Sequence, residues 1–141
     1  MNILRAAAQV TKRGPAEYFT GTVWLDEFDG SAGASPVRIV RVSFEPGART
    51  AWHTHPLGQS LHILSGIGRV QQEGGPVFEV QAGDTVWFEP GERHWHGAAP
   101  RSMMVHLAVQ QADGTGKAVT WLEHVSDADY TRTPRGVEGA A

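Results

Sequence analysis

Two short stretches of the sequence hold histidines at a spacing that could bind a metal ion. They are Trp52-His53-Thr54-His55-Pro56-Leu57-Gly58-Gln59 and Pro90-Gly91-Glu92-Arg93-His94-Trp95-His96. Side chains two residues apart on a strand project from the same face, so His53 and His55 can converge on one ion. Gln59 and His94 would add an amide oxygen and a third imidazole. The predicted metal ligands are therefore His53, His55, Gln59 and His94.

The composition excludes several other kinds of site. The chain has 141 residues, which predicts one domain with its own hydrophobic core. Cysteine is absent, so disulfides, thiolate metal ligands and thiol nucleophiles are excluded. Only histidine, aspartate, glutamate and amide oxygens remain as metal ligands.

Charge and hydropathy limit the partners and the location. The formal net charge of -3 argues against nucleic acid or an anionic membrane as a partner. No apolar run approaches the roughly 20 residues of a membrane span. The N-terminal stretch lacks the apolar core of a signal peptide. We therefore expect a cytoplasmic protein that acts on a small molecule.

The elements that must position the histidines are predicted to be strands. Val40, Val42 and Phe44 alternate with Arg41 and Ser43, so the three apolar side chains should point inward. Many short segments of this kind, separated by turns, predict an all-β sandwich or barrel. The predicted strands are 18–28, 37–45, 50–55, 59–64, 67–73, 77–81, 85–89, 93–98, 102–111 and 118–123.

The chain is predicted to consist of one domain with a short segment at each end. Residues 1–17 are expected to form an N-terminal arm, residues 18–131 the domain and residues 132–141 a tail. One helix is expected near the end of the domain. Ser126-Asp127-Ala128-Asp129 has the pattern of a capped helix start, which predicts a short helix over 126–131.

The two histidine stretches resemble the two sequence motifs of the cupin superfamily. The first motif is matched by Gly47, His53-Thr54-His55, Gln59 and Gly66, with glutamine at 59 where glutamate is usual. The second is matched by Gly83-Asp84, Pro90-Gly91 and His94, with the proline one place later than in the common pattern. This resemblance implies a single-domain cupin double-stranded β-helix, a jelly-roll barrel, with one divalent metal inside it.

A narrower resemblance covers roughly residues 14–130. Segments 14–22, 44–59, 94–100 and 121–125 are similar to the bacterial manganese-dependent cupins with (R)-selective hydroxynitrile lyase activity. The resemblance implies Mn²⁺, reversible addition of cyanide to an aldehyde, and a homo-oligomer, either a dimer or a tetramer. Fe²⁺, Co²⁺, Ni²⁺ and Zn²⁺ stay open as alternatives, because ligand type constrains the metal only loosely.

Gln59 favours bond cleavage over oxidation. Three neutral imidazoles and a neutral amide leave the charge of a divalent ion uncompensated, so the ion would act as a Lewis acid that attracts anions. The resemblance to the superfamily implies that an oxidative cupin would use a glutamate as the fourth ligand, which helps to stabilise a higher oxidation state. The neutral ligand set thus favours lyase or isomerase chemistry, and the resemblance implies a lyase that cleaves or forms (R)-cyanohydrins such as mandelonitrile. The alternatives are a metal-dependent cupin dioxygenase or other oxidoreductase, and a non-enzymatic cupin that binds a small ligand.

Five further residues are predicted to face the same cavity. His96 and His106 are the candidates for moving a proton, since a neutral imidazole can accept and return one. The alternatives are a His96 that orients a ligand and a His106 that is simply part of the barrel. Val40, Val42 and Gln110 are predicted to contact the substrate, against the alternative that they only fill the barrel.

Two histidines are excluded from the predicted site. His62 is expected to face away from the cavity, because its parity on the strand is opposite to that of Leu61. His124 is expected to be structural.

Overall fold

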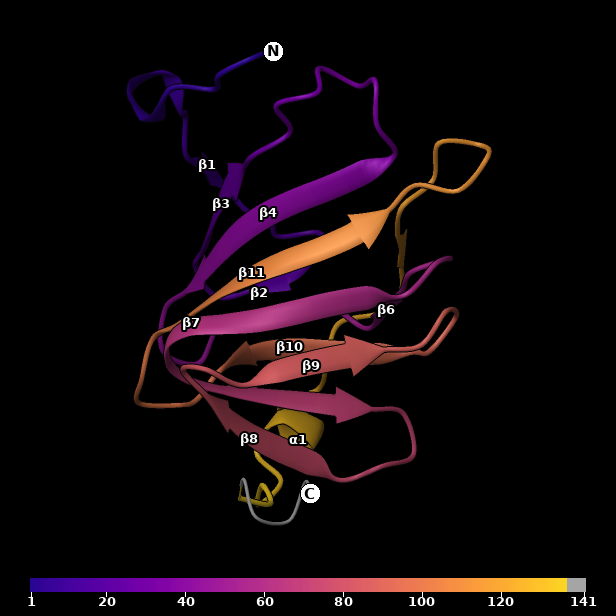
Figure 1. Cartoon of the computed structure of the whole chain (residues 1–141). Helices are drawn as coiled ribbons and strands as arrows, with labels where there is room; N and C mark the ends of the chain where they lie inside the picture. The colour runs from indigo at the N-terminus through magenta and orange to yellow at the C-terminus, as the bar shows by residue number, and fades with distance from the viewer. Residues whose placement is uncertain (137–141) are drawn as a thin grey trace.

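Strands dominate the computed structural model, which describes residues 1–136, and they form two antiparallel sheets that share one long strand (Figure 1). The shared strand is β7 (Gln59–Gln72). The first sheet holds, in spatial order, β1 (Lys12–Arg13), β3 (Val23–Glu27), β4 (Val37–Phe44), β11 (Met104–Gln111), the first part of β7 and β9 (Thr85–Phe88).

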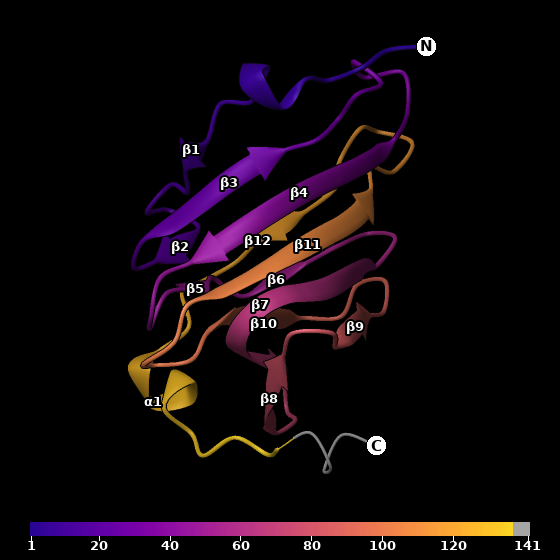
Figure 2. The same ribbon diagram turned by 60° about the vertical axis from the view of Figure 1, so that its left-hand side comes forward.

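The second sheet begins where β7 turns away from the first. It holds β8 (Val77–Gln81), the second part of β7, β10 (His94–Ala98), β5 (Arg49–Thr50) and β2 (Phe19–Thr20). Two further strands, β6 (His53–Thr54) and β12 (Thr120–Trp121), extend β10 at its histidine-bearing end. Figure 2 shows β3, β4, β11 and β7 across the front, with β6 and β12 behind them. The all-β barrel expected from the sequence is confirmed.

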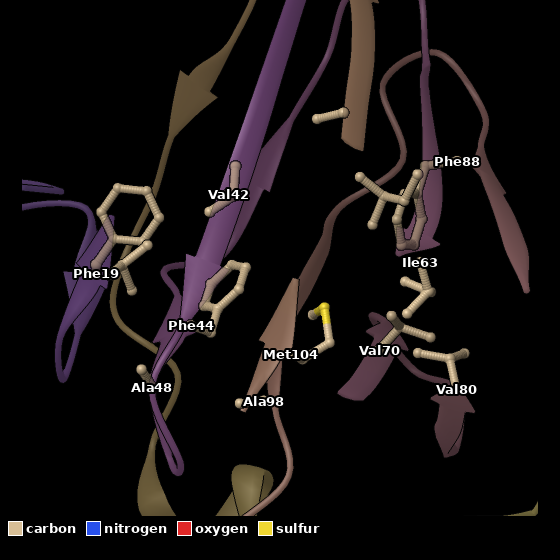
Figure 3. Close-up of a cluster of buried hydrophobic side chains, with 13 residues drawn as sticks. Phe19, Val42, Phe44, Ala48, Ile63, Val70, Val80, Phe88, Ala98 and Met104 are labelled. Atoms are coloured by element: carbon tan, nitrogen blue, oxygen red, sulfur yellow. The ribbon is translucent and has the colours of Figure 1, made fainter. Parts of the chain in front are cut away.

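The space between the sheets is filled by one main apolar cluster (Figure 3). Val42 and Phe44 of β4 are buried in it, and Val40 is half-buried against it. Arg41 is exposed, so the predicted inward and outward faces of this strand are confirmed. The contacting members of the cluster include Phe19, Ile63, Val70, Phe88 and Met104.

The one α-helix among residues 1–136, α1 (Asp127–Tyr130), lies at the end of the molecule away from the N-terminal arm (Figure 1). The hydroxyl oxygen of Ser126 accepts a hydrogen bond from the N–H of Asp129 at 3.1 Å, so the predicted cap and helix are confirmed. The Arg49 guanidinium holds the helix against β5, because it donates to Asp127 at 2.7 Å and lies 4.5 Å from the centre of the Tyr130 ring. The 3₁₀ helix η1 (Ala6–Ala8) lies in the arm.

The chain ends lie against the two sheets in different ways. Strand β1, which belongs to the predicted arm, pairs with β3. Arg135, in the predicted tail, forms a bridge with Phe78 of β8. The last residues of the predicted tail, 137–141, lie outside the described residues. None of the helices formed by residues 1–136 is long and apolar enough to cross a membrane.

Two of the predicted strands are each divided. The segment 18–28 forms β2 and β3, which enter different sheets after a turn at Gly21 with a φ of 80°. The segment 50–55 forms β5 and β6, because Ala51 and Trp52 between them bond to other parts of the chain. The Ala51 N–H donates to the Tyr18 carbonyl, and the Trp52 N–H donates to the Glu123 carbonyl.

The predicted break at residues 65–66 was wrong, because β7 is continuous through them. Gly66, with a φ of 78°, lies near a register shift between β7 and β11 at Val105 and His106. The residues of β7 up to Gly66 pair with β11 in the first sheet, and those from Ile67 pair with β8 in the second. Gly66 therefore marks the place where β7 passes from one sheet to the other.

Replacing Gly66 with alanine is expected to destabilise the protein strongly. A Cβ atom at this position would lie 1.8 Å from the carbonyl oxygen of Met103, and the positive φ would add backbone strain. We expect a loss of about 3–5 kcal/mol in the free energy of unfolding, measured by urea titration. Gly74→Ala is the matched control: its φ is 81° but nothing lies within 4 Å, so it should cost only about 1–2 kcal/mol. Equal losses for the two variants would contradict this role of Gly66.

Candidate metal centre and cavity

Three histidines are oriented by hydrogen bonds to backbone carbonyls. In each of them Nδ1 is the bonded atom, with His53 at 2.9 Å from the Ala51 oxygen, His55 at 2.7 Å from the Ala118 oxygen and His94 at 2.8 Å from the Glu92 oxygen. A carbonyl can only accept, so the proton of each neutral ring is on Nδ1 and the lone pair is on Nε2. Histidines that bind metals are oriented in this way by outer hydrogen bonds.

The three rings lie close together although they do not share a strand. The ring centre of His53 is 4.3 Å from that of His94 and 5.0 Å from that of His55, and the His55 and His94 centres are 5.5 Å apart. The predicted strand geometry was wrong, because β6 ends at Thr54 and His55 lies in the following turn. His55 Nε2 is buried and has no hydrogen-bond partner among residues 1–136. A buried lone pair of this kind fits a metal ligand.

Gln59 brings an oxygen to the same place. The Gln59 Nε2 group donates to Gln110 Oε1 at 2.8 Å, and Gln59 Oε1 lies 3.2 Å from His94 Nε2. Because the His94 proton is used in the shorter bond to Glu92, the Gln59 oxygen and His94 Nε2 face each other as two acceptors. Two lone pairs at this distance repel unless both point to a cation. The contact therefore fits the presence of a divalent ion in the working protein.

Burial keeps the histidines of this site neutral. It lowers the pKa of His94 and of His106 to about 3, and it lowers the pKa of His53 and His96 well below the ordinary value of 6.5. The pKa of His55 is also lowered, again chiefly by burial. Neutral imidazoles are the form that binds metal ions, so no proton has to be displaced at neutral pH.

Acidification is expected to destabilise the metal-free protein. As the pH falls below about 6.5, the unfolded chain takes up protons on its histidines. In the folded protein, His94 and His106 stay unprotonated down to about pH 3. The stability is therefore complete above about pH 6.5 and declines through this window, by about 1.4 kcal/mol per pH unit for each such histidine. Urea unfolding at about pH 7 and about pH 5 measures the effect, and equal free energies of unfolding would contradict it.

His96 and His106 form a hydrogen-bonded pair beside the three rings. His106 Nε2 lies 3.0 Å from His96 Nδ1, so one of these two nitrogens carries a proton and donates it in a hydrogen bond to the other. The other nitrogens, His96 Nε2 and His106 Nδ1, are buried without a partner in the described part of the chain. The prediction that both side chains face one cavity is confirmed, because both line it.

The structure also brings His96 within reach of a metal ion, which the sequence reasoning missed. One ligand nitrogen from each of His53, His94 and His96 lies within 4.8 Å of the other two. This group of three does not include His55, whose ring centre lies 5.0 Å from that of His53, or Gln59, whose Oε1 lies 3.2 Å from His94 Nε2. The sequence did contain a signal for this, because His96 lies two residues after His94 and side chains at that spacing on a strand share a face. The two rings are nearly parallel, with 20° between their planes.

An apolar cavity of about 290 Å³ opens beside the histidines. The predicted substrate contacts Val40, Val42 and Gln110 all line it, together with His53, His55, Gln59, His96 and His106. His94 is the one predicted ligand that does not reach the cavity wall, and its side chain is completely buried. The remaining lining residues are mostly apolar and include Tyr18, Phe19, Leu25, Ala108, Val119 and Trp121.

Part of the cavity wall has no signal in the sequence pattern. The rings of Tyr18 and Trp121 stack with their centres 4.8 Å apart, and they come from opposite ends of the domain. Trp121 pairs with His53 across β12 and β6, packs against the main apolar cluster and lines the cavity. Leu25 could have been found, because it shares the parity of the fully buried Val23 on β3.

The two histidines excluded from the site lie outside it. His62 is exposed and its Nδ1 is 2.9 Å from the Thr85 hydroxyl, which confirms that it faces away from the cavity. His124 is exposed, with its Nδ1 3.5 Å from the Thr20 hydroxyl.

Known proteins share this fold and sequence. Residues 40–109 match the cupin domain family. The chain is 54% identical over 132 residues to the (R)-mandelonitrile lyase of Granulicella tundricola, a match that covers 94% of this chain and all of that one. A cupin-like protein from Thermotoga maritima superposes with a TM-score of 0.78 and 37% identity over 84% of this chain and 89% of its own. The polyketide cyclase RemF from Streptomyces resistomycificus shares the fold, with a TM-score of 0.71 and 17% identity over 92% of this chain and 90% of its own. The chain therefore belongs to the cupin family.

Proposed function

We propose that this cupin is a metal-dependent hydroxynitrile lyase that cleaves (R)-cyanohydrins such as mandelonitrile into an aldehyde and HCN, and that also catalyses the reverse addition. The observation that carries the proposal is the 54% identity to an (R)-mandelonitrile lyase over the whole length of that enzyme. The donor set and the apolar cavity beside it supply the chemistry that such a reaction needs.

The proposed metal ligands are His53, His55, Gln59 and His94, with Mn²⁺ as the proposed ion. His96 lies close enough to be a further donor. Because none of these ligands carries a negative charge, a bound divalent ion would supply a strong Lewis acid for an alkoxide or cyanide. A carboxylate ligand that would favour oxidation is absent from this set.

The His96 and His106 pair is proposed to move the proton. In cleavage, the cyanohydrin hydroxyl gives its proton to an imidazole, and the electrons of the O–H bond form the carbonyl of the aldehyde. The electrons of the C–C bond leave with cyanide, which takes the proton back and departs as HCN. Both rings are neutral and each has an unpartnered nitrogen, so the pair can accept a proton and return it.

The apolar wall of the cavity is proposed to hold the aldehyde side chain. Val40 and Val42 line it, together with Tyr18 and with Trp121, whose ring centre lies 4.7 Å from that of His53. The cavity volume of about 290 Å³ lies just below the usual range for ligand pockets, about 300–1,000 Å³, which favours a compact aryl or alkyl aldehyde.

The proposal is tested by incubating the Mn²⁺-loaded protein with racemic mandelonitrile. We expect benzaldehyde and cyanide to be released in equal amounts, with the (R)-enantiomer consumed first. Failure to release cyanide from mandelonitrile and from aliphatic cyanohydrins would overturn the proposed activity. Tight binding of small acids in the same sample would then favour a ligand-binding cupin.

We also propose that the protein is a cytoplasmic homo-oligomer, a dimer or a tetramer. The outward side chains of β11 are apolar, with Val105 and Leu107 half-buried and Val109 exposed. Such a face can pack against a second copy. Light scattering during gel filtration measures the mass, and a monomer would overturn this proposal.

A further inference from the structure

We infer that Gln110 is a positioning residue that fixes which atom of Gln59 faces the metal. The inference rests on the proposed role of Gln59 as a ligand. The two residues are direct partners in the antiparallel pairing of β11 with β7, and their side chains meet inside the barrel. Gln59 Nε2 donates to Gln110 Oε1 at 2.8 Å.

A glutamine side chain has nearly the same shape when its amide is turned by 180°, but only its oxygen can bind a cation. The bond to Gln110 holds the Gln59 amide nitrogen on the β11 side. Gln59 Oε1 is then left 3.2 Å from His94 Nε2, on the side where the histidine lone pairs gather.

The turned amide would be harmful to the site. Its N–H group would face His94 Nε2 and donate a hydrogen bond to it, which would occupy the lone pair of His94. The same turn would remove the Gln59 oxygen from the donor set. The bond to Gln110 opposes a turn of Gln59 alone, because a turned Gln59 would present its oxygen to the oxygen of Gln110, so both amides would have to turn together.

Gln110 was predicted to contact the substrate, and it does line the cavity. The bond to Gln59 uses its oxygen, so its amide N–H donors are not consumed by the positioning role. Gln110 can therefore both position Gln59 and contact the substrate. Measuring metal affinity without substrate tests the positioning role alone.

The experiment compares the Mn²⁺ affinity of purified variants by competition with a chelator. Gln110→Met keeps the length of the side chain and removes the acceptor, and we expect it to weaken Mn²⁺ binding about 10–100-fold. Gln110→Glu keeps an acceptor that cannot turn into a donor, so it should bind at least as tightly as the wild type. Gln111→Met is the matched control, because Gln111 is exposed on the neighbouring position of the same strand, and its affinity should not change.

A double-mutant cycle separates positioning from a general structural effect. Once Gln59→Met has removed the amide, Gln110→Met should cause no further loss of affinity. Wild-type affinity in Gln110→Met, or an equal additional loss in the double variant, would overturn the inference. Wild-type affinity in Gln59→Met would instead overturn the proposed ligand role of Gln59. Gln110→Ala serves as the second acceptor-free variant if Gln110→Met unfolds.

Discussion

Replacement of His53 by alanine is expected to remove bound metal from the purified protein and to lower mandelonitrile cleavage by at least about 100-fold. His53 is the ring nearest to the other donors, with centres 4.3 Å from His94, 5.0 Å from His55 and 5.1 Å from His96. Its replacement therefore removes the ligand that lies within about 5 Å of all three other histidines. Elemental analysis gives the metal content, and a cyanide-release assay gives the activity.

The matched control for this variant is His62→Ala. His62 is an exposed histidine that faces away from the cavity, so its replacement should change neither metal content nor activity. A full complement of metal in His53→Ala would show that the ion is bound elsewhere.

Replacement of His106 is expected to separate metal binding from catalysis. His106 contacts His96 at 3.0 Å but is not among the proposed ligands, so His106→Ala should keep its metal. Loss of general acid–base catalysis typically costs about 10²–10⁴-fold, and we expect a loss of kcat in this range. The His106 ring packs against Phe44, with the ring centres 5.4 Å apart, so thermal unfolding must be measured alongside.

Two outcomes would remove His106 from the proposed mechanism. Wild-type kcat in a folded His106→Ala protein would show that another group moves the proton. Loss of metal together with activity would place His106 in the metal site instead.

Local patterns in the sequence predicted much of the fold. The alternation at 37–45 gave the inward face of β4, and the Ser126 cap gave α1, because both depend on residues close together in the chain. The divided strand at 50–55 depends instead on distant partners. Ala51 and Trp52 leave the ladder to bond with the carbonyls of Tyr18 and Glu123, and no local pattern records such contacts.

In the site, too, local patterns predicted the residues but not the contacts between distant segments. The residue types and spacing were enough to bring together His53, His55, Gln59 and His94, even though the strand expected to carry His53 and His55 ends between them. The orientation of the site depends on register between strands far apart in sequence. The pairing of Gln59 with Gln110, and of His96 with His106, exists only because β7 lies between β10 and β11.

The most direct test is cyanide release from mandelonitrile by the wild-type protein before and after metal removal, measured both with and without oxygen. The account predicts that chelation abolishes release, that Mn²⁺ restores it, and that oxygen has no effect. Full activity in the chelated protein would contradict the proposed metal dependence. A requirement for oxygen, with no cyanide formed, would contradict the lyase reaction and favour an oxidoreductase.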